Sequence, residues 1–140
     1  MTDWSDKAVG ILDRKREEKN LRDQVFLEKQ KIIKTLGVRL FGDVRSYIRK
    51  HVSALEASRP GILVIQKDLP NEMVVWEIKD GILLRLTFDQ GTLFWAIGST
   101  EQEYFDVTVT EDGSVRLRSG IVPTTPDRIA EQMLDALLRT

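Results

Sequence analysis

The chain of 140 residues contains no cysteine and a single histidine, His51. Without cysteine it can form no disulfide, no thiolate zinc site and no thiol nucleophile. A single histidine also excludes a pair of imidazole metal ligands or a relay between two imidazoles. The glycine-rich phosphate loops and the Gly-x-Ser-x-Gly motif are absent as well. The sequence therefore indicates no catalytic residues, no cofactor and no metal site, and it favours a protein that is not an enzyme.

The chain also lacks an excess of charge and long apolar runs. Basic and acidic residues number 21 and 22, so there is no overall field that would attract nucleic acid or acidic membranes. The longest apolar runs, such as residues 62–65, are too short to span a bilayer, and the N-terminus lacks the pattern of a signal peptide. We therefore expect a cytoplasmic protein without membrane association, and the sequence disfavours nucleic acid as a partner.

A long amphipathic helical pattern dominates the first part of the chain. Its apolar stripe covers about 160° of the helical wheel, a width typical of a helix that packs on a core. Gly37 and Gly42 interrupt the pattern, but the stripe keeps its phase through both, which favours one continuous or kinked helix over two helices. Pro60 ends the helix. The stripe consists of Ile33, Leu36, Leu40, Phe41, Val44, Tyr47, Ile48, His51, Val52 and Leu55.

Residues 1–20 form a distinct segment before this helix. Trp4, Ala8 and Ile11 have helical spacing, and residues 13–20 are almost wholly charged. Such a run has strong helix propensity but no face to bury, so it predicts a charged helical extension. A frayed tail is the alternative. We expect residues 21–140 to form a single α+β domain.

Six short β-rich runs joined by turn residues follow, at 62–67, 73–79, 82–88, 92–98, 104–110 and 114–118. Links this short predict an antiparallel meander. Thr125 and Pro126 suit the start of a short C-terminal helix. The expected fold is thus α+β: a long N-terminal helix, a six-stranded antiparallel β-meander and a short C-terminal helix.

Alternation along the strands predicts one apolar face, on which the helical stripe would pack. We place Val74, Trp76 and Ile78 on this face, together with Leu84, Leu86, Trp95 and the apolar residues at equivalent positions of the later strands. Phe94 and Tyr104 then lie on the reverse face.

Two kinds of candidate site follow from these patterns. A curved sheet around the long helix could enclose a cavity for an apolar ligand, lined by Tyr47, His51, Trp76 and Trp95. Packing in the core is the alternative role for these tryptophans, and His51, in the middle of the helical stripe, fits a packed neutral histidine.

The second kind of site is an interaction surface. Trp4 and Ile11 on the N-terminal segment, and Phe94 and Tyr104 on the reverse sheet face, are its candidate residues. The sequence therefore predicts a non-catalytic protein-interaction or assembly module, a homodimer that could also bind another protein. A small apolar-ligand-binding protein is the alternative.

Overall fold

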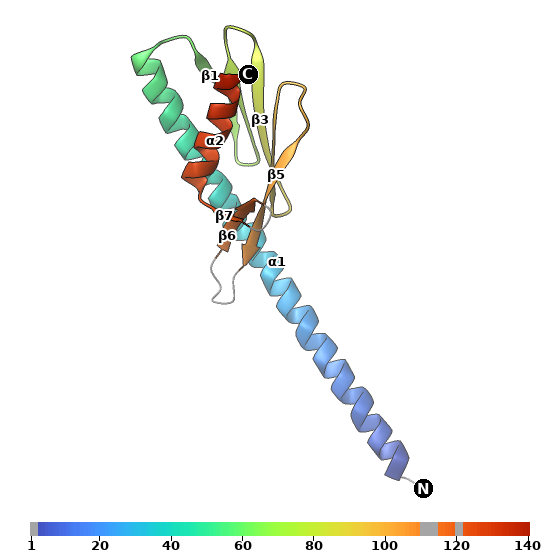
Figure 1. Cartoon of the computed structure of the whole chain (residues 1–140). Helices are drawn as coiled ribbons and strands as arrows, with labels where there is room; N and C mark the ends of the chain where they lie inside the picture. The colour runs from blue at the N-terminus through green and yellow to red at the C-terminus, as the bar shows by residue number, and fades with distance from the viewer. Residues whose placement is uncertain (1–2, 110–114, 120–121) are drawn as a thin grey trace. The chain divides into compact units, whose positions relative to one another are not determined.

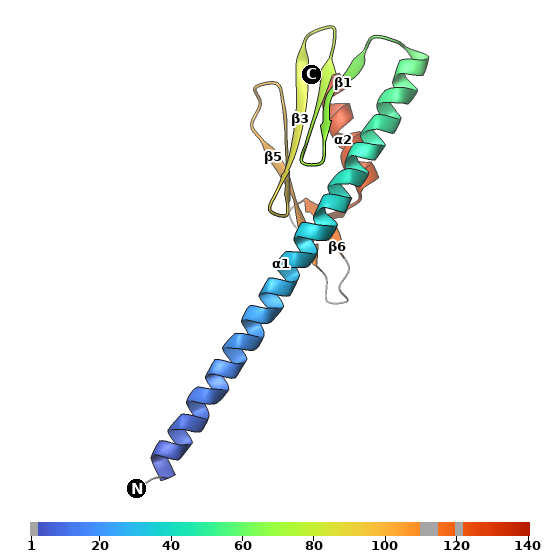
Figure 2. The same ribbon diagram turned by 180° about the vertical axis from the view of Figure 1, so that it is seen from behind.

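A computed structural model describes residues 3–109, 115–119 and 122–140 of the chain (Figures 1 and 2). The chain divides into two compact units, Met1–Lys31 and Ile32–Thr140. Helix α1 includes residues of both units. The elements in chain order are α1 (Asp3–Ser58), β1 (Leu63–Leu69), β2 (Glu72–Glu77), β3 (Ile82–Asp89), β4 (Thr92–Ile97), β5 (Glu103–Val109), β6 (Val115–Ser119), β7 (Val122–Thr124) and α2 (Pro126–Arg139).

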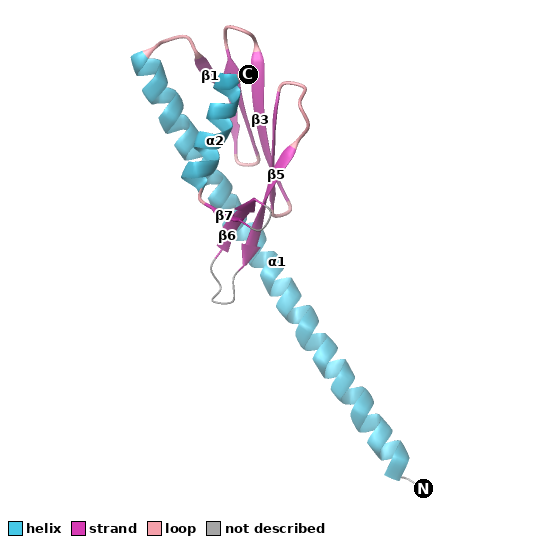
Figure 3. Cartoon of the chain, viewed as in Figure 1, coloured by secondary structure: helices cyan, strands magenta, loops and turns pink. Residues whose placement is uncertain are grey.

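The α+β fold class is confirmed: a long N-terminal helix, an antiparallel sheet and a short C-terminal helix (Figure 3). The sheet has the sequential order β1-β2-β3-β4-β5-β6-β7 in the described part of the chain. The six predicted strands correspond to β1–β6, and α1 is continuous through Gly37 and Gly42. The short strand β7 is an addition that the sequence did not indicate. The turn expected between the runs at 104–110 and 114–118 lies outside the described residues.

One face of the sheet carries the core of the second unit, and we call it the inner face. Both helices contribute side chains to this core, and Thr125 caps α2 by accepting a hydrogen bond from the Arg128 backbone N–H at 3.4 Å. The largest fully buried side chains are Phe41, Val44, Ile48, Met73, Leu84, Leu86, Leu93, Phe105, Ile129, Met133 and Leu137.

The predicted orientation of the second strand is wrong. In β2, Val75 pairs with Leu84 and therefore faces inward, whereas Trp76 pairs with Leu83 on the opposite, outer face. Val74 also faces outward, and Ile78 lies beyond the end of β2. Both rows of this strand contain apolar residues, and the charge of Glu77 falls in the inward row, so alternation along the strand could not identify which row faces inward. Only the register with β3 decides it.

Glu77 belongs to the inward row of β2 and is only 9% exposed. Its carboxylate accepts hydrogen bonds from the backbone N–H groups of Lys79 and Asp80 at 3.1 and 3.0 Å. These donors compensate for the loss of water around the charge, so a charged residue can occupy a position that its polarity assigns to the outer face.

The buried line of α1 is displaced from the centre of the predicted stripe. Gly37, Phe41, Val44, Ile48 and Val52 are its buried residues. The side chains of Tyr47 and His51 are each about 36% exposed and lie at the margin of the packed face. The interpretation of His51 as the middle of the apolar face is therefore wrong.

Glycines allow two close contacts between α1 and the sheet. A Cβ at Gly37 would lie 2.6 Å from Cζ of Phe88, whose ring stacks on Phe41 at 5.8 Å between centroids. Gly91, with φ of 87°, packs against Ile33 in the two-residue turn between β3 and β4. At Gly37 the missing Cβ thus makes room for an aromatic side chain.

Candidate functional site

The four residues expected around one cavity are divided among three places. Trp95 faces inward and is 6% exposed, whereas Trp76 lies on the outer face. Tyr47 and His51 lie on α1, at the margin of its packed face. The structure therefore does not bring the two tryptophans together, because the sheet itself separates them.

His51 instead meets helix α2. Its Nε2 lies 3.4 Å from Oδ1 of Asp127, which is in the first turn of α2. Glu131 follows one helical turn later, and the donor atoms of these three side chains all lie within 4.8 Å of one another. Sequence reasoning missed this cluster, because its two parts are 76 residues apart. The one feature of the sequence that pointed to this cluster is the spacing of Asp127 and Glu131, since residues four apart lie on the same face of a helix.

A groove of about 320 Å³ lies between α1 and α2 beside this cluster. His51, Glu131 and Asp135 supply its polar groups. Its apolar lining consists of Leu55, Leu63, Leu134 and Leu138. The groove thus combines an apolar floor with one imidazole and two carboxylates.

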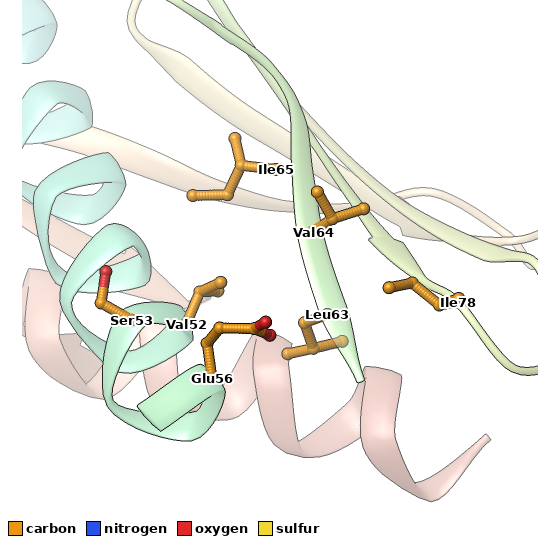
Figure 4. Close-up of a pocket in the computed structure, with 7 residues that line it drawn as sticks. All are labelled: Val52, Ser53, Glu56, Leu63, Val64, Ile65 and Ile78. Atoms are coloured by element: carbon orange, nitrogen blue, oxygen red, sulfur yellow. The ribbon is translucent and has the colours of Figure 1, made fainter. Parts of the chain in front are cut away.

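A second groove, of about 490 Å³, runs along the edge strand β1 (Figure 4). Strand β1 contributes three apolar side chains to it, and α1 contributes Val52, Ser53 and Glu56 (Figure 4). The Glu56 carboxylate accepts a hydrogen bond from the backbone N–H of Gly61 at 3.1 Å. Its charge therefore helps to hold the connection between α1 and β1. The β-strand side is lined by Leu63, Val64 and Ile65, with Ile78 beyond β2.

An ion-pair cluster ties α1 to β1. Arg45 and Arg49 donate to the two carboxylate oxygens of Asp68 at 2.8 and 2.6 Å. Burial acts to raise the pKa of Asp68, but the hydrogen bonds and charges of both arginines outweigh it and hold this pKa below its ordinary value. Arg45 also lies over the Phe41 ring, with 5.4 Å from Cζ to the centroid. The two guanidinium groups and the carboxylate pair with one another, although Nε of Arg45 is buried without a hydrogen-bond partner within the described structure, and we assign this cluster a structural role.

The outer face of the sheet carries the predicted pair Phe94 and Tyr104. They are direct register partners on β4 and β5, and Tyr104 is 57% exposed. Trp76 and Leu83 form another pair on the same face. Both helices pack on the inner face, so these aromatic side chains are not part of the core.

Large exposed apolar side chains are concentrated in residues 3–31. Trp4 is 76% exposed and Ile11 is 47% exposed, and Val25 lies on the same side of the helix because these positions differ by multiples of seven. The exposed set in this segment comprises Trp4, Val9, Ile11, Leu12, Leu21, Val25, Phe26 and Leu27. A surface helix of a soluble domain would carry such residues on a buried face.

Searches against protein-family models, curated proteins and solved structures returned no match to this chain. None of the described helices has an apolar stretch long enough to cross a membrane. The candidate sites therefore rest on the geometry of the chain itself.

Proposed function

We propose that this chain is a non-catalytic protein-interaction or assembly module that forms a homodimer through its N-terminal helical segment. The proposal rests on the eight large apolar side chains that are exposed within residues 3–31. Fully burying one such side chain contributes about 1.5–3 kcal/mol, so a second helix that covers even some of them gains substantial free energy.

Helix energetics support the same proposal. Helical stability in proteins comes mainly from packing of an apolar face, and pairs of opposite charge on a helix surface add only about 0.2–0.5 kcal/mol each. The segment has many charges but few packed side chains. A partner helix would supply the missing contacts, and a second copy of the same chain offers the same face.

The outer sheet face, with Phe94 and Tyr104, is a second candidate surface in this proposal. Aromatic residues are enriched in protein interfaces, and a separate protein partner could occupy this face. The cytoplasmic location expected from the sequence is part of the proposal too. The alternative function, binding of a small apolar ligand, has less support because Trp76 and Trp95 lie on opposite faces.

Sedimentation equilibrium of the full chain tests the proposal. Ile11→Asp and Val25→Asp place a charge on the exposed apolar side of the segment, and each should weaken dimerisation at least about tenfold, since burying an unpaired charge is costly. Asn20→Asp is the control, because it adds the same charge on the side of the helix opposite the row that contains Trp4, Ile11 and Val25. A monomeric wild type, or equal effects of all three substitutions, would contradict the proposal.

A further inference from the structure

The cluster of His51, Asp127 and Glu131 presents one imidazole nitrogen and two carboxylate oxygens from two helices. We propose that it binds a divalent transition-metal ion of the zinc type. An ion pair between His51 and Asp127 would account for only two of the three converging groups. Glu131, one turn along the same side of α2, completes a set of three metal donors.

The donor spacing suits such an ion. Zinc binds nitrogen and oxygen ligands at about 2.0–2.2 Å in a tetrahedron, which places neighbouring ligand atoms about 3.3 Å apart. Nε2 of His51 and Oδ1 of Asp127 are already 3.4 Å apart. The widest separation in the cluster is at most 4.8 Å, so closure requires a movement of at most about 1.5 Å. Glu131 is an exposed residue, and rotation of its side chain can supply this movement.

The local charge also favours a cation. Within the described ranges, the ion-pair partner of Asp127 is His51, and Glu131 has no ion pair. With a neutral imidazole the cluster carries two negative charges, which a dication would neutralise. An imidazole among the donors favours zinc, nickel or copper over calcium and magnesium, which prefer oxygen ligands alone.

The groove beside the cluster gives a further ligand of the bound ion access to the site. Three protein ligands leave a fourth tetrahedral position for water or another small ligand. His51 and Glu131 both line the groove between α1 and α2, so such a ligand can reach the ion. The site would also join the two helices and stabilise the folded state.

Isothermal titration of the metal-free full chain with zinc chloride tests this inference. We expect saturable binding of one ion per chain, and a rise in Tm of about 5–10 °C at a zinc concentration 100 times Kd. His51→Gln and Glu131→Gln should each weaken binding at least about tenfold. Circular dichroism would establish that both variants remain folded.

Asp135→Asn is the matched control, because Asp135 lies one turn beyond Glu131 in the same groove but outside the cluster. It should leave the affinity within about twofold, as expected for a surface charge without a bond to the ion. Absence of saturable zinc binding, or binding that survives either the His51 or the Glu131 substitution, would overturn the proposal. Displacement of zinc by millimolar magnesium would overturn the assignment to a transition metal.

Discussion

Two glycines of α1 differ in what surrounds them. A Cβ at Gly42 would meet Nη2 of Arg45 at 3.7 Å, an ordinary van der Waals distance, whereas a Cβ at Gly37 would overlap the Phe88 ring. Alanine favours a helix over glycine by about 1 kcal/mol. Gly42→Ala should therefore raise the free energy of unfolding by about 0.5–1 kcal/mol.

The same substitution at Gly37 should have the opposite sign. The new methyl group would overlap the Phe88 ring, and stacking on Phe41 limits how far that ring can move. Overpacking typically costs about 1–3 kcal/mol, which exceeds the gain in helix propensity. Urea unfolding measures the free energy of unfolding of both variants. Equal stabilisation by the two alanines would contradict the close contact between Gly37 and Phe88.

Asp68 gives a residue-scale prediction about pH. Its folded-state pKa is lowered, so its contribution to stability is present above the ordinary value of 3.8 and is lost as the pH falls through the lower, folded-state value. Asp68→Asn should lower the free energy of unfolding by about 1–2 kcal/mol at pH 7. The difference from wild type should shrink below about pH 4.

Asp43→Asn is the control for this measurement. Asp43 is an exposed acid on the same helix, and removing its charge should change stability by less than about 0.5 kcal/mol at any pH. Guanidinium titrations between pH 3 and 7 would follow both variants. If the loss of unfolding free energy caused by Asp68→Asn stayed constant across that range, the ion pairs would not set the pKa of Asp68.

At the scale of elements, the register of β2 assigns different roles to two tryptophans. Trp95 is buried on the inner face, so Trp95→Ala should lower the free energy of unfolding by about 3–5 kcal/mol. Trp76→Ala, on the outer face, should cost about 1 kcal/mol. Chemical denaturation measures both values, and equal penalties would indicate that both side chains lie in the core.

The loop between β2 and β3 explains why a charged residue can face the core. Glu77 faces inward because its carboxylate accepts two backbone N–H groups of the following turn. From the sequence, this charge marked the row that also contains Val75 as the outer row. The bonding that reverses the assignment forms only when the turn has folded.

At the scale of the whole molecule, removal of residues 1–20 separates folding from association. The core cluster consists of residues from the second unit, so the truncated chain should remain folded with a Tm close to that of the full chain. Its dimer should be weakened, because Trp4, Ile11 and Leu12 are lost. Native mass spectrometry reports the stoichiometry, and an unchanged dimer after truncation would show that residues 1–20 contribute nothing to the interface.

The elements themselves could largely be predicted. The unbroken apolar pattern through Gly37 and Gly42 indicated one helix, and Thr125 with Pro126 marked the start of α2. The candidate sites could not be predicted as readily. His51 and Asp127 are 76 residues apart, and no local pattern relates them.

The sequence by itself determined the type and order of these elements, because helix and strand periodicity, capping residues and turn residues act over short distances along the chain. The tertiary structure decided which row of β2 faces the core, which side of α1 is buried, and that His51 meets Asp127 and Glu131. These features depend on strand register and on packing between distant segments, where several local patterns are compatible with burial and only the assembled core selects one.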